Sequence, residues 1–365
     1  MKHKAIKITA IAAAAVVVTV IGYLAYLMLS YSRIEDNQTI DITQSGEKVK
    51  ESVSTETEYS IMTYNIGFGA YSDDYSFFMD GGKHSRAFSK ESVLENTNGS
   101  ISIIQNKNPD FVFLQEVDLD STRSYHVNQY DMILDSFDSY STAFGINFDS
   151  AYLFYPFTEP HGKSLSGMAT ISNIQIAYSI RRSLPISENL HKFLDLDRCY
   201  TISKVPVANG KYLCLYNVHL SAYTDDISIV EQQIKMLAKD LQADLEAGNY
   251  IVCGGDFNQD LLGNSPEVFG TDESNENWAS PFPVEFLPEG FDLAVRRLSG
   301  KEQSALAPSC RNADKPYVKG ENFITMVDGF ILSSNVEMTE YQVVDTGFAY
   351  SDHNPVYMKF RLREQ

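Results

Sequence analysis

The sequence predicts an α/β domain that follows a single transmembrane helix. Residues 8–32 contain no charged side chain, which is typical of a helix that spans a membrane. Further along the chain, short and continuously apolar runs such as 111–114 and 250–253 indicate strands that are buried on both faces. Apolar residues recur at helical spacing over 227–245 and indicate an amphipathic helix between such strands. Because no repeat or second linker interrupts residues 59–365, we expect one large α/β domain there.

The N-terminal segment, residues 1–33, is predicted to be a membrane anchor. Its apolar run exceeds the roughly 20 residues that a helix needs to cross a bilayer. It is also longer than the apolar core of a cleaved signal peptide, which is the competing interpretation. Lys2, Lys4 and Lys7 precede the run, whereas Arg33 after it is closely followed by two acidic residues. By the positive-inside rule, we expect a single-pass protein of the cell membrane with a cytoplasmic N-terminus and an extracytoplasmic domain.

The exported part is strongly acidic. The chain contains 29 Lys and Arg and 48 Asp and Glu, and four of the basic residues but none of the acidic ones lie within residues 1–33. The remainder therefore carries 25 minus 48, a formal charge of −23. Such a surface repels polyanions and counts against avid non-specific binding of nucleic acid. It leaves phosphate-ester chemistry open, because a divalent cation reverses the local field.

The segment between the helix and the domain, residues 34–58, is polar. It contains no aromatic residue, and Ser, Thr, Glu, Lys and Gln dominate it. A chain of this composition cannot bury enough apolar area to become ordered. We therefore expect a disordered linker.

The four cysteines form no spaced metal-binding motif. Cys199, Cys214 and Cys253 lie in apolar, strand-like runs, where a free cysteine packs as a small core residue. In an exported protein, a disulfide between Cys199 and Cys214 across a hairpin is also compatible with their spacing. Both alternatives stay open at the level of the sequence.

The first strands of the domain lead to polar residues. The alternating stretch 60–67 predicts a strand that carries Asn65 near its end. Ser89 can cap the helix that follows, which ends before an Asn-Pro pair. The buried strand 111–114 then leads directly to Glu116. A carboxylate at this position is either a strand terminus at the surface or a ligand held over the sheet.

The middle of the domain repeats this pattern. A loop leading into a helix is predicted over 120–137, and strands over 167–172, 196–207 and 212–220, the last two joined by an Asn-Gly hairpin turn. Asn217 and His219 lie two residues apart in the last of these strands and therefore share a face. The amphipathic helix comes next, and Asp225 or Asp226 can cap it while Gly248 can end it.

The C-terminal part supplies the remaining polar residues. Strand 250–253 leads to Asp256 and Asn258, whereas residues 260–322 show no clear period and predict long connections around a short strand or helix. A last internal strand, 325–332, carries Asp328.

Asp352 and His353 stand side by side near the C-terminus. Successive residues of a strand point to opposite faces, so the pair serves one site only if the chain turns there. Pro355 favours such a turn. A surface turn is the alternative for this stretch, as a turn cap is for Asn65 and a core histidine for His219. Polar residues suited to metal or phosphate at six strand ends are nevertheless better explained by one shared site.

Six stretches, in chain order, resemble the motif set of the endonuclease/exonuclease/phosphatase superfamily: TYNIG, LQEVD, YNVHL, GGDFN, VDGFILS and SDHNPV. This superfamily includes deoxyribonuclease I-like nucleases, abasic-site endonucleases, inositol-polyphosphate phosphatases and bacterial sphingomyelinases. The resemblance covers nearly all of residues 59–363. It implies a four-layer α/β/β/α sandwich in which two mixed sheets pack face to face between helices.

The resemblance also implies a role for each matching residue. Glu116 is similar to the magnesium-binding glutamate of the family, with Asn65 and Asp352 beside it as further metal ligands. Asp256 and Asn258 resemble the pair that activates the attacking water and holds the phosphate. The remaining matches are His353 and His219 as phosphate-contacting histidines, Asn217 as a further phosphate-binding residue, and Asp328 as the carboxylate that orients His353. The family pattern does not decide between Asp256 and His353 as the base, or between one metal and two.

These residue types suit phosphodiester cleavage on chemical grounds as well. The reaction needs a hard cation with oxygen ligands, a base near the attacking water and a donor for the developing charge. We expect Mg²⁺ as the cofactor, with Mn²⁺ or Ca²⁺ as alternatives. A hydrogen bond from His353 to Asp328 would fix the histidine tautomer and raise its basicity.

The leading hypothesis is a membrane-anchored, metal-dependent phosphoesterase that acts on phosphodiesters or phosphomonoesters, with lipid head groups favoured by the anchor and the acidic surface. The first alternative is an exported nuclease acting on DNA or RNA. The second is a catalytically inactive binding protein on the same fold. Expected partners are a phosphate-ester substrate and the membrane, and no protein partner is inferred. The aromatic stretches 77–79 and 152–157 suit either lipid contact or core packing.

Overall fold

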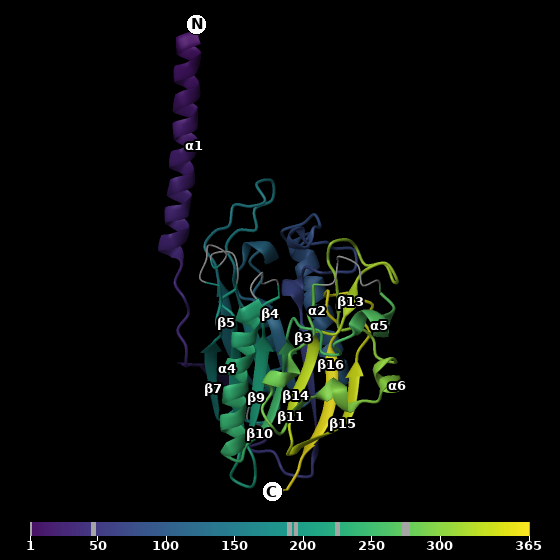
Figure 1. The fold of residues 1–365 in the computed structure, drawn as a ribbon. Helices are drawn as coiled ribbons and strands as arrows, with labels where there is room; N and C mark the ends of the chain where they lie inside the picture. The colour runs from purple at the N-terminus through teal and green to yellow at the C-terminus, as the bar shows by residue number, and fades with distance from the viewer. Residues whose placement is uncertain are drawn as a thin grey trace.

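Two mixed β-sheets packed face to face form the centre of the folded domain, and helices cover both outer faces (Figure 1). The structure is a computed structural model that describes residues 2–44, 49–187, 192, 196–222, 227–271 and 278–364. This arrangement is the four-layer α/β sandwich that the motifs predict.

The first sheet has seven strands in the order β1-β7-β8-β9-β10-β14-β11. Their bounds are Gln38–Thr39 (β1), Tyr178–Ser183 (β7), Cys199–Pro206 (β8), Tyr212–His219 (β9), Tyr250–Asp256 (β10), Asp328–Ser333 (β14) and Phe291–Leu293 (β11). The second sheet also has seven, in the order β15-β16-β3-β4-β6-β5-β2. They are Val336–Val343 (β15), Val356–Leu362 (β16), Glu58–Asn65 (β3), Phe111–Asp118 (β4), Leu165–Ser172 (β6), Ser141–Asp149 (β5) and Ile42–Gln44 (β2).

The remaining elements surround these sheets. The α-helices are Lys2–Ser30 (α1), Lys90–Lys107 (α2), Gln129–Ser136 (α3), Ile227–Glu246 (α4), Ser265–Phe269 (α5) and Gly300–Gln303 (α6). Strands β12 (Cys310–Arg311) and β13 (Ile324–Thr325) form a separate pair, and short 3-10 turns include η1 (Gly67–Gly69), η2 (Phe78–Asp80) and η3 (Thr122–Ser124). The region 260–322 thus contains several short elements, as its lack of periodicity predicts.

Alternation along β4 shows how the layers are held together. Phe111 and Phe113 pack into the core between the sheets, whereas Val112 and Leu114 pack into a second core beneath α2 and α3. Successive side chains of a strand point to opposite faces, so a strand between two apolar layers must be apolar throughout. α4 contributes residues such as Leu237 to the first core from the other side.

Two parallel strand pairs decide where the polar residues meet. β3 runs parallel to β4, and β9 runs parallel to β10. Because parallel strands end at the same edge of a sheet, their C-terminal residues come together. In the first sheet, Asp256 lies opposite His219 on one side and opposite Asp328 on the other.

The helix and turn signals in the sequence agree with the structure where it can be compared. The Ser89 side chain caps α2 by accepting a hydrogen bond from the Ser92 amide. Beyond α4, Gly248 adopts a positive φ of 80° and donates its amide hydrogen to Leu245. The predicted caps of α4, Asp225 and Asp226, lie outside the described residues.

All four cysteines are buried free thiols. In the β8–β9 ladder, Cys199 pairs with His219 and Cys214 pairs with Lys204, so the two cysteines are not neighbours. This register excludes the disulfide that the spacing left open.

The prediction of a disordered linker over 34–58 is wrong for much of the segment. β1 pairs with β7 at the edge of the first sheet, and β2 pairs with β5 at the edge of the second. Ile40, between them, and Val53 are buried. The polar composition did not predict these strands, because an edge strand is held by backbone hydrogen bonds to the neighbouring strand. A polar sequence forms such bonds as well as an apolar one.

The N-terminal helix α1 is long and apolar enough to cross a membrane. It projects away from the domain (Figure 1). Near its C-terminal end, Leu27 is buried and lines a small pocket together with Phe148 of β5.

Candidate active site

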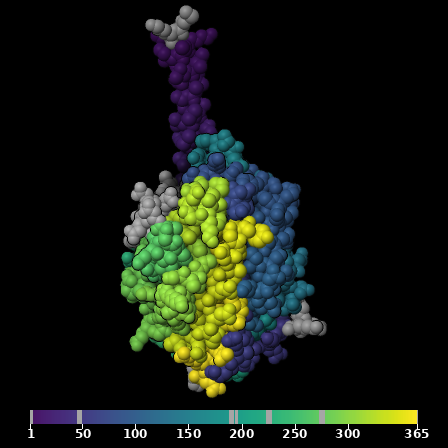
Figure 2. Space-filling view, turned by 90° about the vertical axis from the view of Figure 1, so that its right-hand side faces the viewer, coloured from purple at the N-terminus to yellow at the C-terminus, as the bar shows by residue number. Residues whose placement is uncertain are grey.

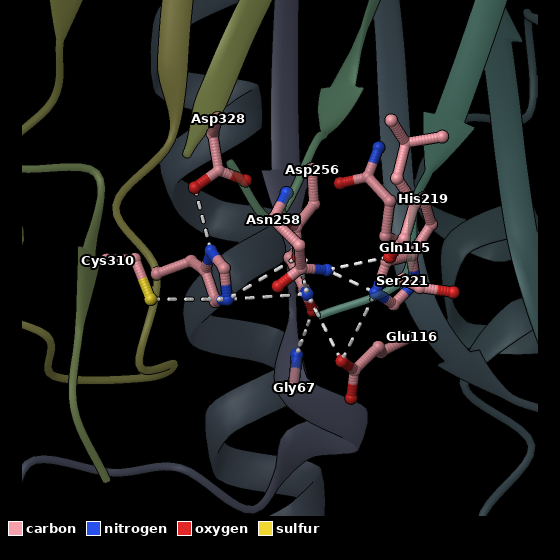
Figure 3. A network of polar contacts seen from close by, with 12 residues as sticks. Gly67, Gln115, Glu116, His219, Ser221, Asp256, Asn258, Cys310 and Asp328 are labelled. Carbon is pink, nitrogen blue, oxygen red and sulfur yellow. Dashed lines mark hydrogen bonds and ion pairs between the residues drawn. The ribbon is translucent and has the colours of Figure 1, made fainter. Parts of the chain in front are cut away.

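Strand ends from both sheets converge on one cleft of about 360 Å³. β4 supplies Glu116, β9 supplies His219 and β10 supplies Asp256. The loop before β16 supplies Asp352 and His353, so the chain does turn there as both residues require. Figure 3 shows Glu116, His219 and Asp256, which come from three different strands, close to one another.

Glu116 reaches the cleft through a distorted backbone. Its φ is +53°, and the β4–β6 register shifts between Leu114 and Val117, which marks a bulge. A left-handed conformation is strained for a residue with a side chain, and such strain concentrates at functional sites. Asn258, after β10, has a similar φ of +52°. The bulge redirects the Glu116 carboxylate, whose side chain is 22% exposed.

Asn65 bridges two carboxylates, Glu116 of the second sheet and Asp256 of the first. Its Nδ2 lies 3.2 Å from Oε1 of Glu116 and 3.1 Å from Oδ2 of Asp256. Its Oδ1 accepts a hydrogen bond from the Gly67 amide at 3.0 Å, which fixes the orientation of the side chain. Asn65 therefore positions both acids.

His353 is held by a buried carboxylate. Its Nδ1 donates to Oδ2 of Asp328 at 2.7 Å, so Nε2 faces the cleft, 3.8 Å from Oδ2 of Asp256. Burial lowers the pKa of His353, but its anionic neighbours, Asp328 foremost, outweigh burial and raise the pKa well above its ordinary value. The protein thus stabilises a protonated imidazole beside Asp256.

Asp256 and His219 complete the centre. Burial raises the pKa of Asp256 to about 6, against the opposing effect of His353. The Asn258 backbone amide donates to Oδ1 of Asp256 at 2.9 Å. His219 Nε2 lies 3.6 Å from Oδ2 of Asp256, and burial together with the charge of Arg198 lowers the pKa of His219 well below its ordinary value. A neutral and a protonated histidine therefore flank one carboxylate.

A model of the endonuclease/exonuclease/phosphatase family matches residues 62–308, more than half of the chain. The chain belongs to this family. The match agrees with the resemblance that the motifs indicate. A search of curated protein sequences finds no match.

Solved structures of other proteins share the fold. An endonuclease/exonuclease/phosphatase from Beutenbergia cavernae DSM 12333 superposes with a TM-score of 0.60 at 18% identity, over 84% of this chain and 72% of that chain. TDP2 from D. rerio, complexed with a single strand DNA product, superposes with a TM-score of 0.54 at 16% identity, over 84% of this chain and 100% of that chain. ANGEL2, a 2′,3′-cyclic phosphatase, superposes with a TM-score of 0.54 at 14% identity, over 92% of this chain and 100% of that chain. At these identities the likeness shows the fold alone.

The donor set of the cleft fits a divalent cation. Glu116 and Asp352 both line the cleft. Burial raises the pKa of Asp352, and the charge of Glu116 raises it further against the effect of His353. Two neighbouring carboxylates in a buried site are costly unless a positive charge compensates them, and carboxylate oxygens are the ligands that Mg²⁺ prefers.

The geometry revises the prediction that Asn65 is a metal ligand. Asn65 presents its amide nitrogen, not its oxygen, to Glu116 and Asp256, because its oxygen faces Gly67. In this arrangement it orients the acids and offers no oxygen to a cation between them.

A second acidic cluster also has ligand-type atoms close together. Within the described residues, Asp256, Asp328 and His353 each offer one ligand atom, and these atoms lie within 4.8 Å of one another. The hydrogen bond between His353 and Asp328 already uses the facing atoms of that pair. We therefore interpret this cluster as a charge-assisted hydrogen-bond network.

The structure corrects the prediction that Asn217 binds phosphate. Asn217 is fully buried between the sheets. Its Oδ1 accepts from Gln115 at 2.8 Å, and its Nδ2 donates to the carbonyl oxygens of Leu114 and Ala169. All of its polar atoms are satisfied by protein, so it braces the strand that bears Glu116. Asn217 lies on the same face of β9 as His219, as expected, but it lies further from the cleft, in contact with the second sheet.

Among the described residues, Arg123, Arg198 and Arg311 line the cleft, and none of them belongs to the sequence motifs. Arg123 follows Glu116 by seven residues in the sequence and pairs with Asp118 at 2.8 Å. Arg198 donates to the Leu220 carbonyl, and Arg311 donates to the Ser72 carbonyl. Arg198 directly precedes β8, and Arg311 belongs to the two-residue strand β12, so no periodicity in the sequence predicts where either side chain points. Arg198 and Arg311 thus bring positive charge to a cleft that is also lined by Asp80, Glu116, Asp256 and Asp352.

Proposed function

We propose that this protein is a membrane-anchored, divalent-metal-dependent phosphoric ester hydrolase whose domain lies outside the cytoplasm. The observation that carries the proposal is the juxtaposition, in one cleft, of paired carboxylates for a cation with an Asp256–His353–Asp328 network for proton transfer. Mg²⁺ is the cation that we expect, because the donors are hard oxygens.

The cation would be held by Asp352 and by Glu116, which Asn65 and the bulge in β4 position. When bound, it would neutralise the phosphate and so ease attack by water. In the proposed reaction, the oxygen of water forms a bond to phosphorus, and the P–O bond to one alcohol breaks. Asp256 orients the water and accepts its proton. His353, protonated and held by Asp328, donates to the phosphate oxygen or the departing alcohol.

Membrane anchoring and topology form the second part of the proposal. α1 is long enough to span the bilayer, and the lysines that precede its apolar run favour a cytoplasmic N-terminus. Phosphate esters are the common chemistry of the DNA product bound by D. rerio TDP2 and of the 2′,3′-cyclic phosphates named for ANGEL2. The charge of −23 beyond residue 33 favours lipid over nucleic acid as the source of the ester here.

Turnover of a soluble diester tests the function. The full chain is purified in detergent, and hydrolysis of bis(p-nitrophenyl) phosphate is measured with Mg²⁺ and with excess EDTA. We expect activity only with Mg²⁺, and a loss of at least about 100-fold in Glu116→Gln, which removes a ligand charge but keeps the shape. Glu95→Gln, on the exposed face of α2, is the control and should retain activity. Full activity in EDTA would refute the proposal.

A further inference from the structure

The loop that joins β5 to β6 exposes a group of aromatic side chains. Phe154 is 49% exposed, Tyr155 63% and Phe157 84%. A contiguous apolar group of this kind on a surface marks a contact with another molecule or with a membrane. We call residues 152–157 the aromatic loop.

The aromatic loop has a defined conformation. Below the tip, Leu153 and Gly162 exchange two backbone hydrogen bonds, of 3.0 and 2.9 Å. On the far side of the tip, the amide of Ser85 donates to the Glu159 side chain, and Arg86 Nε donates to the carbonyl oxygen of Pro160. Hydrogen bonds on both sides of the tip therefore hold the exposed aromatic rings in a fixed position.

The aromatic loop contacts α1 near its C-terminal end. The rings of Tyr23 and Phe154 meet edge to face with centroids 5.3 Å apart. The Tyr152 amide donates to the Tyr26 hydroxyl at 3.0 Å, and the Tyr23 hydroxyl donates to the Tyr152 carbonyl at 3.3 Å. Figure 2 shows the teal segment of this region against the base of the purple helix.

The position of these contacts along α1 sets the depth of the loop. Lys7 is the last charged residue before the apolar run. At about 1.5 Å per residue, the roughly 30 Å of hydrocarbon is spanned about 20 residues later, near Leu27. Tyr23 and Tyr26 then lie at the outer boundary, where tyrosine is enriched in membrane proteins. A loop that touches both tyrosines lies at the level of the lipid head groups.

The same loop borders the mouth of the cleft. Tyr155 packs on Phe78 with centroids 5.9 Å apart, and Phe78 packs on His161 with centroids 6.1 Å apart. His161 lines the cleft, together with Met79, which is 62% exposed. A chain of contacts thus runs from α1 through the aromatic loop to the wall of the cleft.

We propose that the aromatic loop inserts into the outer surface of the bilayer that α1 crosses, so that the cleft opens onto this surface and takes the phosphodiester of a membrane lipid. The substrate assignment rests on the proposed function. Water adds to the phosphorus, one P–O ester bond breaks, and a phosphomonoester and an alcohol are released, one of which keeps the acyl chains. The acidic domain fits zwitterionic lipids, because an anionic surface would repel it.

Fluorescence quenching tests the insertion. Full-length Phe157→Trp and Tyr212→Trp are reconstituted into phosphatidylcholine vesicles that contain lipids brominated on the acyl chains. Tyr212 is a matched control, because it is 39% exposed and begins β9, at the opposite end of the strand from His219 in the cleft. The signal of the single native tryptophan, Trp278, is measured in the parent and subtracted. We expect strong quenching of the Phe157→Trp signal and none of the Tyr212→Trp signal. An unquenched Phe157→Trp would overturn the insertion.

Hydrolysis tests the substrate class with a combined variant, Phe154→Ser, Tyr155→Ser and Phe157→Ser. We expect unchanged turnover of bis(p-nitrophenyl) phosphate but at least tenfold slower hydrolysis of phosphatidylcholine in the vesicles. The control, Tyr178→Ser with Tyr212→Ser, should leave both activities unchanged. Soluble turnover without lipid hydrolysis in the wild type would overturn the lipid assignment alone. Lipid hydrolysis by the loop variant at the wild-type rate would overturn the role of the aromatic loop. If the wild type did not hydrolyse bis(p-nitrophenyl) phosphate, the proposed function itself would be refuted.

Discussion

At the scale of single residues, one hydrogen bond organises the site. Nδ1 of His353 donates to Asp328, and both side chains are buried. We predict that Asp328→Asn lowers turnover by about 10- to 1000-fold without unfolding the domain, because a neutral amide no longer stabilises the positive charge of the protonated ring. His353→Ala should lose at least as much activity.

The two residues should act as a unit, so the double variant should be little slower than His353→Ala alone. Turnover of the four proteins on one soluble diester at saturating Mg²⁺ measures this, with circular dichroism as the control for folding. Strictly multiplicative losses would mean that Asp328 and His353 work independently.

His161, in the wall of the cleft, predicts a pH dependence of stability. Burial, with the nearby charge of Arg123, lowers the pKa of His161 to about 4. In the unfolded chain the pKa is about 6.5, so between these values the unfolded state binds more protons and folding loses stability as the pH falls. From pH 8 to pH 5 this linkage amounts to about 2 kcal/mol.

Replacement of this histidine should remove that contribution. His161→Gln keeps a donor for the Ser85 carbonyl, which His161 Nδ1 contacts at 3.0 Å. We therefore expect the free energy of unfolding of the variant in urea to decline less between pH 8 and pH 5 than that of the wild type. Identical declines in the two proteins would show that His161 is not the group responsible.

At the scale of elements, the β9–β10 pair positions His219 and Asp256 and has no room for a side chain at Gly255. Gly255 has a φ of +144°, and a Cβ there would lie 2.0 Å from the Val218 carbonyl oxygen. We predict that Gly255→Ala separates the strands, lowers the free energy of unfolding by about 2–4 kcal/mol and reduces turnover.

Gly210 provides the matched control for backbone conformation. Its φ is also positive, +81°, but a Cβ there meets nothing within 4 Å. Gly210→Ala should cost only about 1 kcal/mol and leave turnover unchanged. Equal losses in the two variants, measured by urea unfolding, would indicate that backbone conformation and not the close strand contact is responsible.

Most strands and the sheet edge at which they end could be predicted from the sequence, because local sequence patterns determine them. The continuous apolar run of β4 predicts a strand between two layers, and polar residues at strand ends predict a shared edge. The edge strands β1 and β2 could not be predicted, since their order comes from sheets formed by distant residues. Likewise, the depth of Asn217 and the positive φ of Glu116 depend on how the two sheets pack together.

At the scale of the whole molecule, the anchor and the cleft make a prediction about topology. The chain should stay in the membrane fraction after alkaline carbonate extraction, because about 20 apolar residues hold α1 in the bilayer. Protease added outside intact cells should digest the domain. A domain that is protected until the cells are lysed would reverse the proposed orientation.

Glu116 and Asp352 should bind a divalent cation beside the Asp256–His353 network. The most direct test is a titration of the full-length protein with Mn²⁺, with free Mn²⁺ followed by electron paramagnetic resonance. We expect saturable binding that is weakened at least tenfold in Glu116→Gln and in Asp352→Asn, but not in Glu95→Gln. Binding of equal strength in the wild type and in both cleft variants would contradict it.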